Sequence, residues 1–144
     1  MSTALAQGVF DTMWAKDFFS QWLGLQLESI ASGHCIMTYK VRKEMLNGHQ
    51  SIHGGVLFSA SDSVFAFACN SNNELAVALD VSITFTKPAF EGDELRVEAI
   101  KIHHGKRIGL YEVKTYNAQK ELICSFKGTC YTNGKSVIQK EENT

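Results

Sequence analysis

The sequence predicts an α+β fold in which one curved antiparallel sheet of about six strands wraps round a central helix. Residues 55–69 form an apolar run of helical length, and the segments after residue 73 alternate in the manner of strands. The breaks between those segments are too short for parallel crossovers. Residues 1–144 are expected to form a single domain, with residues 133–144 as a flexible tail.

The elements are expected in the order helix, hairpin, long helix and four strands. Apolar residues at three- and four-residue spacings predict one amphipathic N-terminal helix over residues 3–22. Alternation on both sides of a Ser-Gly turn predicts an antiparallel hairpin over residues 23–41. Four strand-like segments follow and are predicted to pair in sequence order as a meander: 74–90, 93–104, 107–117 and 121–132.

Composition and charge exclude several classes of protein. The formal net charge of -1 gives no reason to expect nucleic acid or an anionic membrane as partner. We find no apolar stretch of about 18 residues and no secretion signal. The four cysteines contain no C-x-x-C pair, so we interpret them as buried reduced thiols, which favours the cytoplasm. The expected ligand is therefore a small molecule.

One acid, Asp62, interrupts the apolar run. Apolar side chains cover nearly the whole circumference of residues 55–69, which indicates a helix buried on all sides. An ionised carboxylate is costly to bury without a partner. In a purely structural role, Ser59, Ser61 or a backbone amide would satisfy it, or the helix would be less buried than it looks. We favour the other interpretation, in which Asp62 belongs to a reactive site.

The residues before this helix suggest an anion-binding helix start. Gly54 and Gly55 would leave backbone amides unshielded where the helix dipole favours negative charge, which makes an oxyanion hole. Adjacent glycines are also ordinary turn residues. Asn47 and His53 flank the turn and would hold a substrate carbonyl, a water molecule or the loop itself. Together with Asp62 they make a stronger candidate site than any of them alone.

The stretch LNGHQSIHGGVLFSASDSVFAFACN, residues 46–70, resembles the hotdog-fold acyl-CoA thioesterases, in particular the hydroxyphenylacetyl-CoA thioesterases of phenylacetate catabolism. The resemblance runs from the first helix through residue 134. It implies that Asp62 is the catalytic carboxylate and that the Gly54 amide polarises the thioester carbonyl. It also implies that Asn47 and His53 orient substrate or water.

This resemblance implies hydrolysis of an acyl-CoA, such as an aryl-acetyl-CoA, to free acid and CoA. A thioester carbonyl is already activated, so no metal and no cofactor are expected, and coenzyme A is part of the substrate. Asp62 would act as a general base or as a nucleophile, and both mechanisms stay open. Ser61 stands where the family usually has alanine.

The spacing of two site residues predicts a shared site. Asp62 lies eight residues beyond Gly54, which corresponds to about 12 Å along a helix, too far for one chain to bring them to the same carbonyl. Two helices packed antiparallel across a two-fold axis would bring Asp62 of one chain to Gly54 of the other. The family's obligate dimers agree with this. We expect a homo-oligomer, as a dimer of dimers.

Cations are expected to bind the phosphates of coenzyme A. Lys87, Lys106 and Arg107 occur at predicted strand ends, where they are either phosphate ligands or solvated turn charges. One of three alternating strand residues is a further candidate to line the site: Asp80, Ser82 or Thr84. Three aromatic residues of the helix would form either an acyl pocket or the core: Phe58, Phe65 and Phe67.

Three rival functions have different signatures. A metal hydrolase would use His49, His53 and Asp62, but Gln50 stands where zinc proteases have glutamate. A non-catalytic acyl-CoA-binding module on the same fold would not need the acid in the helix. A hydratase would want a histidine and an acid placed at the carbon next to the thioester. The sequence favours hydrolysis over all three.

Overall fold

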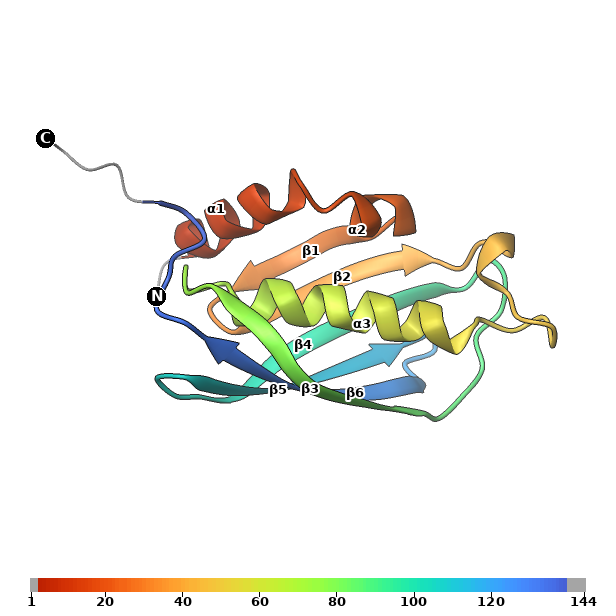
Figure 1. Cartoon of the computed structure of the whole chain (residues 1–144). Coiled ribbons are helices and arrows are strands. Elements are labelled where there is room, and N and C mark those ends of the chain that lie inside the picture. The colour runs from red at the N-terminus through yellow and green to blue at the C-terminus, as the bar shows by residue number, and fades with distance from the viewer. Residues whose placement is uncertain (1–2, 140–144) are drawn as a thin grey trace, which may run out of the picture.

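The computed structural model describes residues 3–139 and shows one six-stranded antiparallel sheet curved round helix α3 (Figure 1). Helices α1 and α2 lie beside α3, near strand β1 (Figure 1). The predicted fold class is therefore confirmed. The bounds are α1 Thr3–Trp14, α2 Phe18–Leu23, β1 Gln26–Ala31, β2 His34–Lys40, a 3-10 turn Lys43–Met45, α3 Gly54–Cys69, β3 Ala76–Phe85, β4 Glu94–His104, β5 Ile108–Tyr116 and β6 Leu122–Thr132.

The prediction of one N-terminal helix was wrong. The helix ends at Trp14, and Asp17 begins a second one by accepting a hydrogen bond from the backbone N–H of Ser20 at 3.0 Å. Aspartate competes for backbone amides in this way, so it favours a helix start over a helix interior. The second helix includes Leu23, so the first strand begins later than predicted. The β1–β2 hairpin itself is confirmed.

The predicted meander is confirmed for β4, β5 and β6 and is wrong for β3. The strand order is β1-β2-β4-β5-β6-β3, so β3 pairs with β6 at the edge of the sheet. Residues 86–93 connect β3 to β4 and contain Pro88, which has no N–H to donate to a sheet. This segment is long enough to leave the sheet and to let β4 pair with β2. The edge position of β3 decides where the site lies.

Helix α3 packs into the concave face of the sheet. Phe65 sits directly against Gly128, where an added Cβ would lie 2.8 Å from the ring. Phe67 packs against the rings of Phe10 and Trp14 of α1. Both phenylalanines are fully buried, so they belong to the core and not to an acyl pocket. All four cysteines are free and buried, as predicted.

The end of the described chain is bound to the loop after α3. The N–H of Leu75 donates to the carbonyl of Lys135 at 2.9 Å, and the N–H of Ile138 donates to Asn73 Oδ1 at 2.7 Å. Lys135 and Ile138 of the predicted tail therefore have hydrogen-bond partners in this loop, and residues 140–144 lie outside the described residues. Among the helices of residues 3–139, none has the length and apolarity needed to cross a membrane.

Candidate active site

The loop before α3 is organised by Asn47. Its Oδ1 accepts hydrogen bonds from the N–H of His49 at 2.8 Å, the N–H of Ser51 at 3.3 Å and the hydroxyl of Ser51 at 3.4 Å. The oxygen of this amide is thus used inside the loop, while the Nδ2 donors have no acceptor among the described residues. Asn47 lines a cleft at the start of α3, so its NH₂ group is the part available to a ligand.

His53 is the N-cap residue of α3. Its Nδ1 accepts the backbone N–H of Gly55 at 2.8 Å, so a neutral imidazole there carries its proton on Nε2. This bond uses the Gly55 amide, which the sequence had suggested as a ligand for substrate. His53 is exposed, and its ring lies over the first turn of the helix. Within one chain, the contact of His53 orders the helix start, and a role toward substrate or water stays a prediction.

Gly54 keeps an unpaired amide. Its N–H has no acceptor among the described residues, and the positive end of the α3 dipole adds to its attraction for negative charge. Gly54 lines a cleft of about 470 Å³. The other residues of the cleft are Asn47, Ser51, Ile52, Leu57, Phe85, Thr86, Lys87 and Pro88. The geometry suits a carbonyl whose oxygen gains negative charge.

Phe85 is a site residue that sequence reasoning missed. It is the last residue of β3, and its ring covers Gly54 so closely that an added Cβ there would lie 2.9 Å from Cζ. The ring is 53% exposed, so it forms an open wall of the cleft. No local pattern could identify it, because only the curvature of the sheet brings residue 85 to residue 54.

Asp62 lies two turns further along α3 and does not line this cleft. It is half-buried on a strip of α3 that its own chain leaves partly uncovered, together with Gly55, Ser59 and Ala66. The expectation that the helix is buried on all sides was therefore wrong for a single chain. Asp62 makes no hydrogen bond to the described residues, and burial raises the pKa of its carboxyl.

The structural alternative for Asp62 is wrong in one part and confirmed in the other, because neither serine binds the acid but α3 is less buried at this strip than the sequence indicates. Ser59 donates its hydroxyl to the carbonyl of Gly55 at 2.8 Å, and Ser61 is fully buried with no hydrogen-bond partner within residues 3–139. Neither serine satisfies the acid. Asp62 is thus a half-buried carboxylate on an uncovered helix face, with no partner among the described residues. Such a carboxylate is typical of a reactive site.

The three predicted cations are divided between two ends of the sheet. Lys87 lines the Gly54 cleft and pairs with Glu121. Lys106 and Arg107 lie in the β4–β5 turn and line a different hollow of about 260 Å³, together with Glu74. One chain thus places Asn47, Gly54 and Lys87 in one cleft, with His53 next to it in the sequence but not among its lining residues, and the other two cations line a different hollow.

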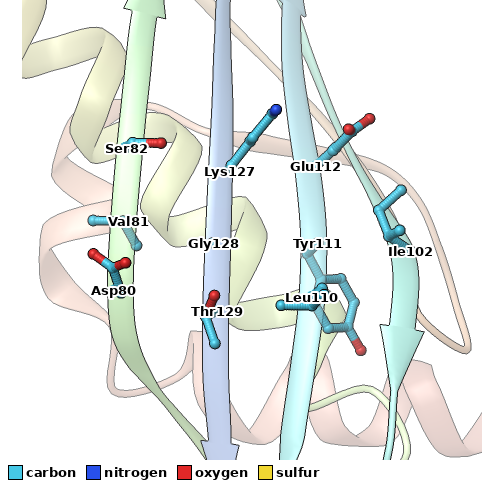
Figure 2. Close-up of a pocket in the computed structure, with 10 residues that line it drawn as sticks. All are labelled: Asp80, Val81, Ser82, Ile102, Leu110, Tyr111, Glu112, Lys127, Gly128 and Thr129. Carbon is cyan, nitrogen blue, oxygen red and sulfur yellow. The ribbon is translucent and has the colours of Figure 1, made fainter.

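The strand candidates do not face the cleft. Asp80 and Ser82 line a hollow on the outer face of the sheet, with Lys127 and Glu112 on neighbouring strands (Figure 2). Thr84 is exposed and lies outside the Gly54 cleft. The sheet separates this hollow from α3, which lies behind the strands in Figure 2. None of the three lines the candidate site of its own chain.

The metal-site alternative receives no support from the geometry. His49 and His53 both precede α3, and His49 is exposed in the Asn47 turn. Within residues 3–139, no three side chains of histidine, cysteine, aspartate or glutamate gather as a metal site would require.

One antiparallel sheet that wraps a central helix defines a hotdog fold. Residues 49–124 match the family model described as "Thioesterase superfamily", and the chain belongs to that superfamily. The predicted family and the prediction of an enzyme are thereby confirmed.

Two relatives cover nearly the whole chain. The chain is 39% identical to the acyl-coenzyme A thioesterase PaaI of Escherichia coli over 125 residues, which are 87% of this chain and 89% of that protein. It is 35% identical to a putative esterase of Archaeoglobus fulgidus over 127 residues, 88% of this chain and 82% of that protein.

Two solved structures have the same fold as this chain. The E. coli PaaI protein from the phenylacetic acid degradation operon superposes with a TM-score of 0.91 at 37% identity, covering 93% of this chain and 97% of that one. A Streptococcus mutans protein bound to acetyl-CoA superposes with a TM-score of 0.76 at 28% identity, covering 78% and 90%.

Proposed function

We propose that this thioesterase hydrolyses acyl-CoA, with aryl-acetyl-CoA esters such as (hydroxy)phenylacetyl-CoA as its substrates. The observation that carries the proposal is the unpaired Gly54 amide in an open cleft, on the same helix as the unpaired carboxylate of Asp62. The name of the E. coli relative and the operon of its structure support the substrate class. Four buried free thiols support action in the reducing cytoplasm.

The chemistry follows from these groups. The thioester oxygen accepts the Gly54 N–H, and the negative charge that develops on it is stabilised by that amide and by the α3 dipole. The Asn47 NH₂ group is a second donor at the same cleft. Asp62 either deprotonates the water that attacks the carbonyl or attacks it directly, forming a mixed anhydride that water then hydrolyses to the free acid. In both routes the C–S bond breaks and the leaving thiolate takes up a proton. Coenzyme A leaves as the thiol, and no metal or cofactor takes part.

A second copy of the chain completes the site. Strand β3 is an unpaired edge ten residues long, and exposed edges of this length are ready to pair. Antiparallel pairing of two β3 strands about a two-fold axis continues the sheet and sets the two α3 helices antiparallel. Asp62 of one chain then approaches Gly54 of the other. The Lys106–Arg107 end of one chain approaches the other's cleft as well.

The outer sheet face is the surface we propose for pairing of two such dimers. Ile102 and Leu110 are 56% and 41% exposed there, next to Glu112 and Lys127, which are register neighbours on β5 and β6 (Figure 2). A surface with an apolar centre and both charge signs can match a second copy of itself across a two-fold axis. The expected assembly is a homotetramer.

The decisive experiment is a panel of phenylacetyl-, hydroxyphenylacetyl-, benzoyl- and straight-chain CoA esters, assayed for release of free thiol. Fastest turnover of the aryl-acetyl esters is expected. Asp62→Asn should lower kcat by about 10²- to 10⁴-fold, while Asp11→Asn, an exposed acid on α1, should not change it. CoA-ester binding without thiol release would instead support a non-catalytic binding module. No binding of any ester would contradict the proposal.

A further inference from the structure

Lys87 is fixed at the wall of the Gly54 cleft by its backbone. The N–H groups of Thr86 and Lys87 both donate to the carbonyl of Ile123, at 2.9 Å and 3.3 Å. The Thr86 hydroxyl donates to the carbonyl of Leu122 at 2.6 Å. These bonds attach the end of β3 to the start of β6. The side chain of Lys87 therefore leaves the backbone at a fixed position between Phe85 and Pro88, which also line the cleft.

Glu121 holds that ammonium group. One carboxylate oxygen pairs with Lys87 Nζ, and the other accepts Asn117 Nδ2–H at 3.1 Å. Asn117 in turn accepts the backbone N–H groups of Glu121 at 2.9 Å and Gln119 at 3.1 Å through its own side-chain oxygen. The β5–β6 turn thus presents the carboxylate to Lys87 in a fixed position.

The pair is open to an arriving anion. The side chains of Lys87 and Glu121 are 45% and 42% exposed, so a phosphate in the cleft can reach the ammonium group. While Lys87 and Glu121 form their ion pair, however, the two charges cancel and one ammonium N–H donates to the carboxylate. The hydrogen bond from Lys87, followed by that from Asn117, holds the pKa of Glu121 below its usual range, so the carboxylate stays charged at neutral pH.

We propose that Glu121 competes with the phosphates of coenzyme A for the ammonium group of Lys87. This competition lowers the affinity of the cleft for coenzyme A and so speeds release of the CoA product. The inference rests on the proposed function, because it takes coenzyme A as the ligand of the cleft. Glu121 touches no reacting atom in this arrangement. It is a positioning residue that acts through Lys87.

The test is the affinity of the oligomeric enzyme for free CoA, measured by titration calorimetry, in the wild type and in Glu121→Gln. Glutamine keeps an oxygen for Asn117 but loses the charge. We expect Kd for CoA to fall by about two- to fivefold, the range of an exposed ion pair. KM for the same acyl group on N-acetylcysteamine, which has no phosphates, should not change. Asp11→Asn is the control, since Asp11 is an exposed acid on α1 and lies outside the cleft.

A second background separates competition from simple repulsion. If Glu121 acts through Lys87, Glu121→Gln should have little effect on Kd in a Lys87→Gln chain. An equal effect in both backgrounds would mean direct repulsion of the phosphates and would overturn the inference. So would a Kd that Glu121→Gln leaves unchanged or raises, while the wild type still binds CoA. Absence of CoA binding to the wild type would overturn this inference and the proposed function together.

Discussion

The imidazole Nδ1 of His53 accepts the N–H of Gly55 at 2.8 Å, and the N–H of Gly54 is left as the unpaired amide at the start of α3. The two glycines of one short motif therefore have different tasks. Gly55 closes the first turn with the help of the histidine, while Gly54 faces the cleft. His53 serves the site by fixing this geometry.

Replacing the cap should cost stability. His53→Ala removes the acceptor of the Gly55 N–H and is expected to lower the free energy of unfolding by about 0.5–2 kcal/mol. His53→Asn should restore most of it, because asparagine is a good N-cap. Urea denaturation followed by circular dichroism measures both. His49→Ala, an exposed change in the same loop, is the control. Equal midpoints for the two alanine variants would contradict the capping role.

Adding one methyl group at Gly54 should damage catalysis. The Cβ of Gly54→Ala would lie 2.9 Å from Phe85 Cζ, so the aromatic wall must move away from the amide. We expect kcat/KM to fall by about 10- to 100-fold, as for misplacement of a catalytic donor. Gly48→Ala is the matched control, since its Cβ meets no atom within 4 Å. The double variant Gly54→Ala, Phe85→Ala should recover part of the loss if crowding is its cause.

Asp62 should lower stability at neutral pH. Burial raises the pKa of this carboxyl in the folded chain above its unfolded value of about 3.9. Between these two pKa values the folded chain binds more protons, so stability falls as pH rises through that window and stays lower above it. Asp62→Asn is therefore expected to resist urea better than the wild type at pH 7. The advantage should vanish near pH 3, and an advantage that is equal at both pH values would exclude this cause.

Two inactive chains should complement each other. A hybrid of an Asp62→Asn chain and an Asn47→Ala, His53→Ala chain contains one site in which the acid and the helix start are both intact. Thiol release should reappear after the two chains are unfolded together and refolded, and it should be absent from each chain alone. Correctly formed hybrids without activity would argue strongly against a shared site.

The outer face should govern the step from dimer to tetramer. Ile102→Lys and Leu110→Lys each place a charge in its apolar centre and should yield active dimers, as measured by size-exclusion chromatography with light scattering. Leu5→Lys, an equally exposed leucine on α1, is expected to leave the tetramer intact. A wild-type protein that elutes as a dimer would refute this use of the outer face.

Much of the fold could be predicted because its signals are local. The apolar run after Gly54 predicts α3, and alternation predicts each strand. One exception has a local cause, because Asp17 starts a second helix, whereas the edge position of β3 depends on the packing of the whole chain. The aromatic residues Phe65 and Phe67 could not be assigned to core or pocket from spacing alone, because both fates share the same helical period.

The sequence by itself determined the local groups at the start of α3, since the amide, the cap and the acid lie within one stretch of chain whose helical rise is fixed. Tertiary structure alone decided which distant residues join them. Phe85 and Lys87 reach Gly54 only through the curvature of the sheet, and Glu121 reaches Lys87 only because β3 pairs with β6. Strand order depends on the packing of the whole chain, which no short pattern encodes.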